Sequence, residues 1–304
     1  GFQSPTTKRI NWNSPAYRLY EKAKKYGMWD PKDIDFSQDV EDWKKLDEKE
    51  QRLVLTLVSL FIAGEEAVTY DLVPLLAAIG RRGELEDEMY LTTFVFEEAK
   101  HMEFFTRWLE AVGVTEDLSS YHGENYKKIF YEELPKVMDR LIEDASDEAL
   151  IRASTTYNKV AEGMLAEGGY YAFREALRRN GLMPGLLKGI DYINRDEGRH
   201  IGYGTYLISR LVNKNPDNFK VFQDQMNKLL PYAIGVTQER SQETAGAFGL
   251  PAGFTTEYVQ KQFSIRMSKI QRALKQSIQE LEEETNRDFD IMHEQFDSEI
   301  SSAS

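Results

Sequence analysis

The chain has 304 residues, of which 51 are acidic and 38 are basic, and its formal net charge is −13. This negative charge argues against nucleic acid or an anionic membrane surface as a partner. The sequence contains no cysteine, which excludes disulfides and thiol chemistry, and we expect a cytoplasmic protein.

Helical patterns follow one another along most of the chain, and no extended β-type alternation stands out. A capping box of Asp47 and Glu50 marks the start of the first long helix, in which Pro74 should cause a bend. That helix includes a nearly apolar run, Leu53 to Gly64, which is too short to span a bilayer, so we expect no membrane span. The four long helices are predicted over about 47–80, 84–111, 147–181 and 184–215.

The remaining segments are shorter. Residues 114–130 are predicted to be mostly loop, and a helix over about 131–143 should be broken or kinked at Pro135. Beyond the long helices we expect C-terminal helices over about 217–287, one at about 217–247 and the last at about 256–287. A Ser-rich tail over 297–304 should follow. No shift in composition divides the chain, so residues 1–304 are predicted to form a single domain with its core at about 47–215.

Two Glu-x-x-His frames are the most informative motifs, and they begin at Glu98 and Glu197 near the middle of two long helices. A Glu and a His three residues apart project from one helix face and can reach the same metal ion. A further glutamate precedes each frame, Glu65 by 33 residues and Glu162 by 35 residues. The predicted metal ligands are therefore Glu65, Glu98, His101, Glu162, Glu197 and His200.

One ligand set per long helix predicts the fold as well as the site. The helices should pair first with second and third with fourth, with a longer connection between the pairs. This arrangement is the ferritin-like four-helix bundle, an all-α fold in which such ligand sets hold two metal ions. The C-terminal helices are expected to pack against this bundle.

The donor atoms favour redox metals with open coordination positions. Four carboxylates would neutralise two divalent ions, which reduces the cost of burying the charges. Carboxylate oxygen and imidazole nitrogen suit iron and manganese, and the absence of thiolate argues against copper(I) or structural zinc. Six protein ligands leave positions for dioxygen, water or a substrate, as oxygen activation requires.

Neighbouring carboxylates leave alternatives for three of the ligands. Glu66 is the alternative to Glu65, and Glu97 is the second choice beside Glu98. Glu167 is the alternative to Glu162, which is preferred because its spacing to the following frame mirrors that of the first pair.

Two carboxylates and two histidines receive other roles. Glu97 and Asp196 directly precede the frame glutamates and are predicted to accept the second N–H of the ligating imidazoles. Their alternative role is that of exposed helix charges. His122 and His293 are interpreted as surface histidines rather than ligands.

Small residues beside the ligands predict room for a bound molecule. Gly64 precedes Glu65, and Ala166 and Tyr170 follow Glu162 on its helix. Glycine inside a helix is unfavourable relative to alanine, so it needs a reason. We predict that Gly64, Ala166 and Tyr170 line a ligand pocket, and close helix packing is the alternative.

With these residues the sequence resembles the small, metal-bearing subunit of class I ribonucleotide reductase and, more closely, the ligand-binding oxidases of that superfamily. The resemblance rests on the six ligands, on Val68 one turn past Glu65, and on Tyr157 five residues before Glu162. It implies a homodimer with one manganese and one iron, or two irons, which activates dioxygen beside a long-chain fatty acid bridging the metals. It also implies an ether cross-link between Val68 and Tyr157.

Three other functions share the ligand pattern. A radical-generating reductase subunit would usually carry a tyrosine four residues after the first histidine, where this chain has Phe105. An acyl-carrier desaturase or a bacterial monooxygenase component would need a carrier or ferredoxin partner. A metal-storage protein would form a large cage.

Overall fold

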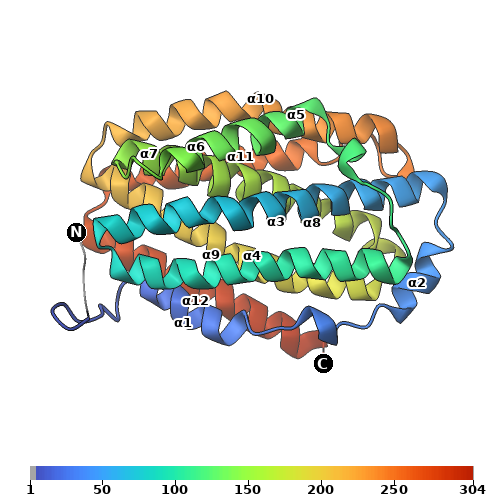
Figure 1. Ribbon diagram of the computed structural model, residues 1–304, viewed down its shortest axis with the longest axis horizontal. Helices are drawn as coiled ribbons and strands as arrows, with labels where there is room; N and C mark the ends of the chain where they lie inside the picture. Colours follow the sequence, from blue (N-terminus) through green and yellow to red (C-terminus); the bar gives the residue numbers. More distant parts are fainter. Residues whose placement is uncertain (1–4, 304) are drawn as a thin grey trace.

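The computed structural model describes residues 5–303, and these residues form helices without any strand (Figure 1). The α-helices are α1 (Pro15–Tyr26), α2 (Ser37–Trp43), α3 (Glu48–Arg82), α4 (Leu85–Val112), α5 (Glu124–Lys127), α6 (Leu134–Arg140), α7 (Asp147–Ser154), α8 (Glu167–Ala176), α9 (Pro184–Lys214), α10 (Asn218–Thr244), α11 (Thr256–Arg272) and α12 (Ile278–Ala303). Two stretches are π-helical, η3 (Lys128–Glu133) and η4 (Thr155–Ala166). Short 3₁₀ turns are η1 (Pro31–Asp33), η2 (Ser119–Tyr121), η5 (Arg178–Asn180), η6 (Ala247–Gly249) and η7 (Ala273–Lys275).

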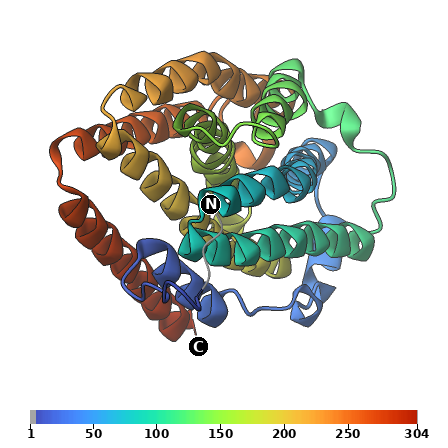
Figure 2. The ribbon, with the colours of Figure 1, turned by 60° about the vertical axis from the view of Figure 1, so that its left-hand side comes forward.

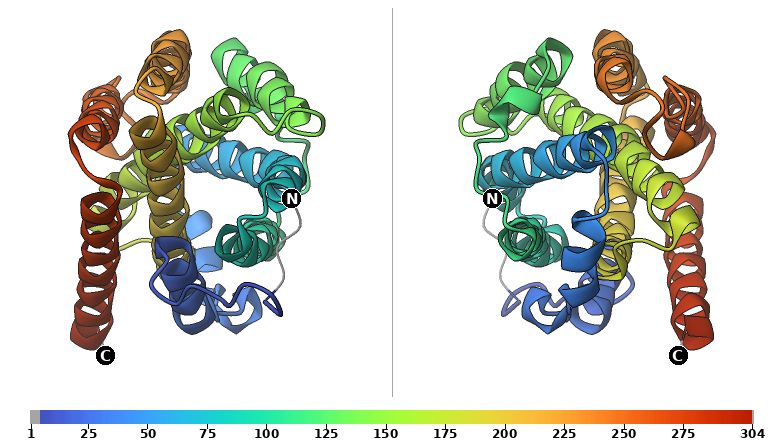
Figure 3. Two further views of the ribbon diagram at one scale, coloured as in Figure 1. Left: turned by 90° about the vertical axis from the view of Figure 1, so that its left-hand side faces the viewer. Right: turned by 90° about the vertical axis from the view of Figure 1, so that its right-hand side faces the viewer.

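The core is a ferritin-like bundle of four long helical rods. The rods are α3, α4, the continuous run of α7, η4 and α8, and α9. As predicted, α3 packs against α4, and η4 and α8 pack against α9. Figure 3 views the bundle from its ends and shows α10, α11 and α12 along its flank. The all-α, ferritin-like prediction is confirmed.

Local sequence signals fix the ends of the first two rods. Asp47 and Glu50 form the predicted capping box, with the two hydrogen bonds at 2.9 and 3.0 Å. The predicted end of α3 at Gly80 is wrong, since Gly80 lies inside the helix. The helix ends at Gly83, whose φ of 73° is a left-handed conformation that glycine adopts without strain. Gly113 ends α4 in the same way, with φ of 79°.

Two short segments differ from the prediction. The expected loop over 114–130 contains α5 and the start of η3, so the chain is already helical at Glu124. Pro135 does not break this rod, since helical geometry continues from η3 into α6, and the change from π-helical to α-helical geometry at Leu134 directly precedes the proline.

The C-terminal region forms two helices where one was predicted over about 256–287. Ser277 and Glu280 exchange hydrogen bonds of 2.7 and 3.2 Å, a capping box that begins α12 after the turn η7. The sequence contains this Ser-x-x-Glu signal, which the prediction overlooked. The predicted tail over 297–304 is also wrong for its described part, since α12 continues to Ala303.

The last helix, α12, lies beside the first helix, α1 (Figure 2). Asp290 of α12 pairs with Lys22 at 2.8 Å and with Arg18 at 3.4 Å. These contacts hold the N-terminal helix against the bundle.

Helix α3 is long and apolar enough to cross a membrane by length and composition, although 59% of its most apolar segment is buried within the fold. The sequence interpretation considered only the shorter run from Leu53 to Gly64 and missed this length. Core helices of soluble proteins have the same composition, and α3 lies in the bundle core and carries Glu65.

Candidate metal centre

The structure brings together the six side chains that the sequence predicts as ligands. They form two groups of four, and all ligand atoms within a group lie within 4.8 Å of one another. One group is Glu65, Glu98, His101 and Glu197, and the other is Glu98, Glu162, Glu197 and His200. Glu98 and Glu197 belong to both groups, so the arrangement provides two adjacent positions with two shared carboxylates.

The cluster is deeply buried, and four of its donor atoms lack a hydrogen-bond partner. Each of the six side chains is at most 6% exposed. The Nδ1 atoms of His101 and His200 and one oxygen each of Glu162 and Glu197 are buried without a hydrogen-bond partner. Such unsatisfied groups are rare in folded proteins and need an explanation. Oxygen and imidazole donors that converge in this way fit two ions such as manganese or iron.

The pKa shifts of the cluster's carboxylates also favour bound cations. Burial and the neighbouring Glu98 carboxylate raise the pKa of Glu65 well above its usual value. Burial also raises the pKa of Glu197, with contributions from Glu162 and Glu98. These carboxylates repel one another in a low-dielectric site, and cations between them would remove that repulsion.

Each histidine is oriented by a carboxylate from the opposite helix. His101 Nε2 lies 3.1 Å from Asp196 Oδ2, and His200 Nε2 lies 2.7 Å from Glu97 Oε2. Glu97 belongs to α4 and Asp196 to α9, so the two contacts cross between the helices. When Nε2 donates to a carboxylate, Nδ1 is free to face the cluster. Arg199 donates to Glu97 at 2.6 Å and to Asp196 at 2.5 Å and joins the two contacts.

The N-terminal segment completes the surroundings of Asp196, a feature that sequence reasoning missed. Trp29 Nε1 donates to Asp196 Oδ2 at 2.8 Å. The ammonium of Lys100 lies 3.6 Å from the same carboxylate and 4.4 Å from the Trp29 ring centroid. Trp29 and Asp196 are 167 residues apart, and no local pattern announces a contact over that separation.

The alternative ligands lie elsewhere. Glu66 is exposed, and Glu167 pairs with Arg266 at 3.1 Å. The interpretation of His122 and His293 as surface residues is wrong, because they are 7% and 2% exposed. His122 contacts Ser59 Oγ at 2.9 Å and Tyr131 Oη at 2.6 Å, and His293 Nδ1 contacts the Phe289 carbonyl. Neither histidine belongs to a group of potential metal ligands among the described residues.

The third rod is π-helical where it carries the site. Stretch η4 contains both Tyr157 and Glu162, which are buried. Tyr157 donates to Glu98 Oε1 at 2.9 Å, which places its phenol oxygen at the edge of the cluster. Such π-helical geometry is uncommon and occurs frequently at functional sites, and the sequence prediction of a regular helix did not include it. The Val68 side chain lies outside the described part of the structure.

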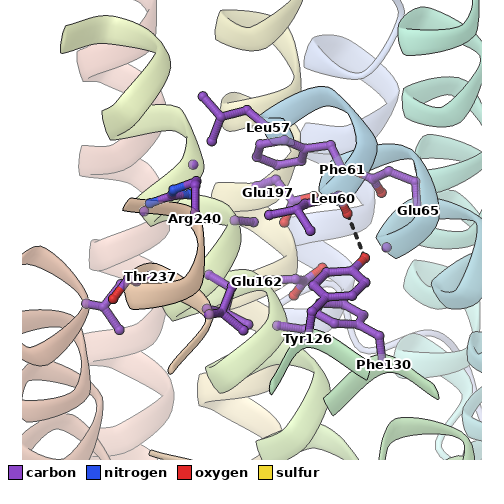
Figure 4. A pocket seen from close by; sticks show the side chains of 18 of the residues that line it. Leu57, Leu60, Phe61, Glu65, Tyr126, Phe130, Glu162, Glu197, Thr237 and Arg240 are labelled. Carbon is purple, nitrogen blue, oxygen red and sulfur yellow. Dashed lines mark hydrogen bonds between the residues drawn. The ribbon is translucent and has the colours of Figure 1, made fainter. Parts of the chain in front are cut away.

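A cavity opens beside the cluster (Figure 4). Its wall includes Glu65, Glu162 and Glu197, and the other lining residues are mainly apolar. Gly64 and Ala166 line the cavity, as the sequence predicted. Tyr170 does not line it: this residue packs behind Phe61, with ring centroids 4.9 Å apart. An apolar wall with a few convergent polar groups is typical of a small-molecule site.

The sequence matches the family model of the ribonucleotide reductase small chain over residues 9–273. An R2-like ligand-binding oxidase with aerobically reconstituted Mn/Fe cofactor is 47% identical and has a TM-score of 0.84, covering 88% of this chain and 96% of that chain. A valine-to-leucine mutant of an R2-like ligand-binding oxidase, also with that cofactor, is 46% identical with a TM-score of 0.85, covering 88% and 97% of the two chains. This chain belongs to the ribonucleotide reductase small-chain family, among its R2-like ligand-binding oxidases.

Membership in this group confirms the resemblance that the sequence motifs indicated. The chain is a metal-dependent oxidoreductase, and its solved relatives carry a Mn/Fe cofactor. In this chain the buried cluster of carboxylates and histidines occupies the centre of the same fold.

Proposed function

We propose that this protein is an oxygen-dependent oxidase that holds one manganese and one iron between Glu65, Glu98, His101, Glu162, Glu197 and His200. The observation that carries the proposal is the pair of four-residue groups, which share Glu98 and Glu197 and adjoin an apolar cavity. When bound, the two metals supply the redox chemistry for activating dioxygen. The cavity would hold a long-chain fatty acid or a similar hydrocarbon ligand.

The protein's own residues position and shield this chemistry. Asp196 and Glu97 hold the Nε2–H of His101 and His200, so that each Nδ1 faces the cluster. Apolar side chains around the cavity exclude water, which strengthens electrostatic interactions within it. Tyr157 keeps its proton at the cluster edge, because burial and nearby carboxylates raise its pKa well above the usual value.

Elemental analysis tests the metal assignment. Protein from cells supplied with manganese and iron should contain about two transition-metal ions per chain, as expected for this ligand set. His101→Ala and His200→Ala should lower the metal content, whereas His293→Ala should not. Zinc alone, or no bound metal in the wild type, would refute the assignment.

The proposed ligand can be extracted and identified. Solvent extraction and mass spectrometry of the purified protein should yield a long-chain fatty acid. Gly64→Leu should reduce the yield, because its side chain would project into the cavity. Gly64→Ala is the matched control, since an added Cβ would lie 3.5 Å from Phe130 and 3.7 Å from Tyr126 Oη, at ordinary contact distances. An empty extract from the wild type would contradict the proposal.

We also propose an ether bond between Val68 and Tyr157. Val68 follows Glu65 by three residues on α3, and the Tyr157 oxygen lies 2.9 Å from Glu98 Oε1. The new bond joins the Tyr157 oxygen to the tertiary carbon of Val68. Each side chain loses one hydrogen atom, and the two electrons and two protons pass to dioxygen.

Tryptic mass spectrometry tests this bond. After anaerobic reconstitution and exposure to oxygen, the Val68 and Tyr157 peptides should appear as one species, lighter by two hydrogens than their sum. Tyr157→Phe should abolish this species while both metals stay bound. Two separate, unmodified peptides after complete oxidation would exclude the bond.

We further propose that the protein is a cytoplasmic homodimer. One chain has a mass of 35.2 kDa, so sedimentation should give about twice that value. A large cage would instead favour metal storage. A tyrosyl radical at the usual reductase position is excluded, because Phe105 lacks a hydroxyl and is fully buried against Phe61.

A further inference from the structure

One charged side chain in the cavity wall has no role in the proposed metal centre. Arg240 of α10 lines the cavity and is only 8% exposed. It is the one cationic residue among the described residues of the lining. Figure 4 shows Arg240 and Thr237 on one side of the cavity and Glu65 on the opposite side, with Phe61 between them.

The protein does not neutralise Arg240 among the side chains that the structure describes. Its guanidinium donates to the Thr255 hydroxyl and forms no ion pair with any described carboxylate. The neighbouring Thr237 hydroxyl is already engaged by the Ile234 carbonyl and by Thr256 at 2.9 Å. Burial alone lowers the pKa of Arg240 to about 10, so the side chain remains charged at neutral pH.

Two other arginines inside the fold are paired with carboxylates. The buried Arg199 contacts Glu97 and Asp196, and the half-buried Arg210 contacts Glu84 and Asp87. Buried charges are normally paired, because an isolated one is strongly unfavourable in a low-dielectric site. Arg240 faces a cavity, so its counter-charge can come from a molecule bound there.

We infer that Arg240 binds an anionic group, a carboxylate, of the molecule in the cavity. This inference rests on the proposed function and narrows it, because the ligand becomes an amphiphile with its anionic group at the α10 wall. Guanidinium binds carboxylate through two parallel hydrogen bonds, and only one donor of Arg240 is occupied by Thr255. If the head group of the acid bridges the metals, as the family resemblance implies, the carboxylate at Arg240 is the second one of a dicarboxylic acid. A fatty acid bound in the opposite direction, with its single head group at Arg240, is the alternative that the experiment distinguishes.

Ligand binding by the full-length, metal-loaded and delipidated protein tests the inference. The probes are hexadecanoic acid, hexadecan-1-ol and hexadecanedioic acid, with affinities measured by calorimetry. Arg240→Gln should weaken binding of an acid about tenfold or more, because a charge-assisted pair is lost, and should leave binding of the alcohol unchanged. If Arg240→Gln binds both acids more weakly, Arg240 contacts the single head group of a fatty acid. If it binds only the diacid more weakly, Arg240 contacts the second carboxylate of the diacid.

Two further variants and a measurement without metal show whether the preference for acids depends on the charge of Arg240. Arg240→Lys should retain most of the preference for acids, and Arg174→Gln, which removes a charge away from the cavity lining, should not change it. Any acid preference that Arg240 confers should persist in metal-free full-length protein. The unliganded Arg240→Gln protein should melt no lower than the wild type, since it loses an unpaired buried charge.

The outcomes separate this inference from the proposed function. If Arg240→Gln binds both acids as tightly as the wild type does, the inference is overturned. Equal binding of acid and alcohol by the wild type would also overturn it, while leaving the apolar ligand in place. If the wild type binds none of the three probes, the proposed ligand fails as well.

Discussion

Glu98 and Glu197 are the residues on which both halves of the candidate metal centre depend. Each belongs to both four-residue groups, whereas the other four side chains each belong to one. The residues that follow in importance are not ligands. Glu97 of α4 contacts His200 of α9, and Asp196 of α9 contacts His101 of α4. A substitution of Glu97 should therefore alter the orientation of His200. Tuning of this kind by a neighbouring carboxylate is typical of metal-bound histidines.

Glu97→Gln should therefore weaken metal binding although Glu97 is outside both ligand groups. Its amide presents one acceptor where the carboxylate has two, and Glu97 now serves both His200 and Arg199. We expect metal affinity to fall about 10- to 100-fold. Competition with a chelator measures the change, and Glu66→Gln, an exposed neighbour of Glu65, is the control. Equal affinities of the two variants would contradict this role for Glu97.

At the scale of the elements, two features matter most. The π-helical stretch η4 forms part of the site, and the junction between α11 and α12 places the last helix. Stretch η4 contributes Tyr157, Glu162 and part of the cavity wall. The junction turns the chain so that α12 can lie against α1 and α9. The first feature has no recognised sequence signal, whereas the second is encoded by the Ser277–Glu280 capping box.

Ser277→Ala should loosen the start of α12. Loss of an N-cap side chain typically costs about 1 kcal/mol, because a backbone N–H of the first turn loses its partner. Hydrogen–deuterium exchange should show faster exchange of amides at the start of α12 and no change in α3. Ser264→Ala, at an exposed position within α11, is the control. Unchanged exchange at the start of α12 would show that tertiary packing alone defines this boundary.

Asp71 of α3 makes the stability of the folded protein depend on pH. It is 3% exposed, one carboxylate oxygen has no partner, and burial together with nearby Asp139 raises its pKa to about 6. Because the folded-state pKa is above the unfolded value of about 3.9, the folded state binds the extra proton. The stability that this proton supplies is complete below pH ~4 and is lost as the pH rises through about 6.

Asp71→Asn should remove this dependence. The variant should melt higher than the wild type at pH 7.5, where Asp71 is charged, and the difference should shrink or vanish as the pH falls below about 4. Asp144→Asn is the comparison, because hydrogen bonds from Ser146 lower the pKa of that carboxyl instead of raising it. A difference between Asp71→Asn and wild type that is constant with pH would show that folding does not shift the pKa of Asp71.

At the scale of the whole molecule, the sequence predicted what periodicity and motif spacing encode. The four rods, the Asp47 capping box and the side chains that converge on the cluster follow from those local patterns. Contacts over long separations were not predictable, such as Trp29 with Asp196. Tyr170 shows the same limit, since helical spacing places it near Glu162 but cannot show that Phe61 separates it from the cavity.

The burial of His122 could not be predicted from the local sequence pattern either. His122 lies in a polar stretch, yet its ring is covered and bonded to Ser59 of α3 and to Tyr131. Its partners are 63 and 9 residues away, so the satisfied polar contacts exist only in the folded chain. The polar residues around His122 in the sequence therefore suggested that it is exposed, whereas the folded chain buries it and supplies its hydrogen-bond partners.

Metal removal should destabilise the entire bundle rather than one helix. The six candidate ligands come from α3, α4, η4 and α9, so bound cations would link all four rods at once. A ligand that binds only the folded state stabilises it by about 2.7 kcal/mol at a free concentration 100 times its Kd. Treatment with a chelator should therefore lower the melting temperature of the wild type, and returning manganese and iron should restore it.

His101→Ala is the matched control for this experiment, because it removes a donor from one four-residue group and leaves the other group complete. Its melting temperature should respond less to the chelator than that of the wild type, while His293→Ala should respond fully. The melting curves should be followed by far-UV circular dichroism, which reports all four rods together. A wild-type melting temperature that does not change on chelation, with loss of metal verified by elemental analysis, would show that bound cations do not stabilise the bundle.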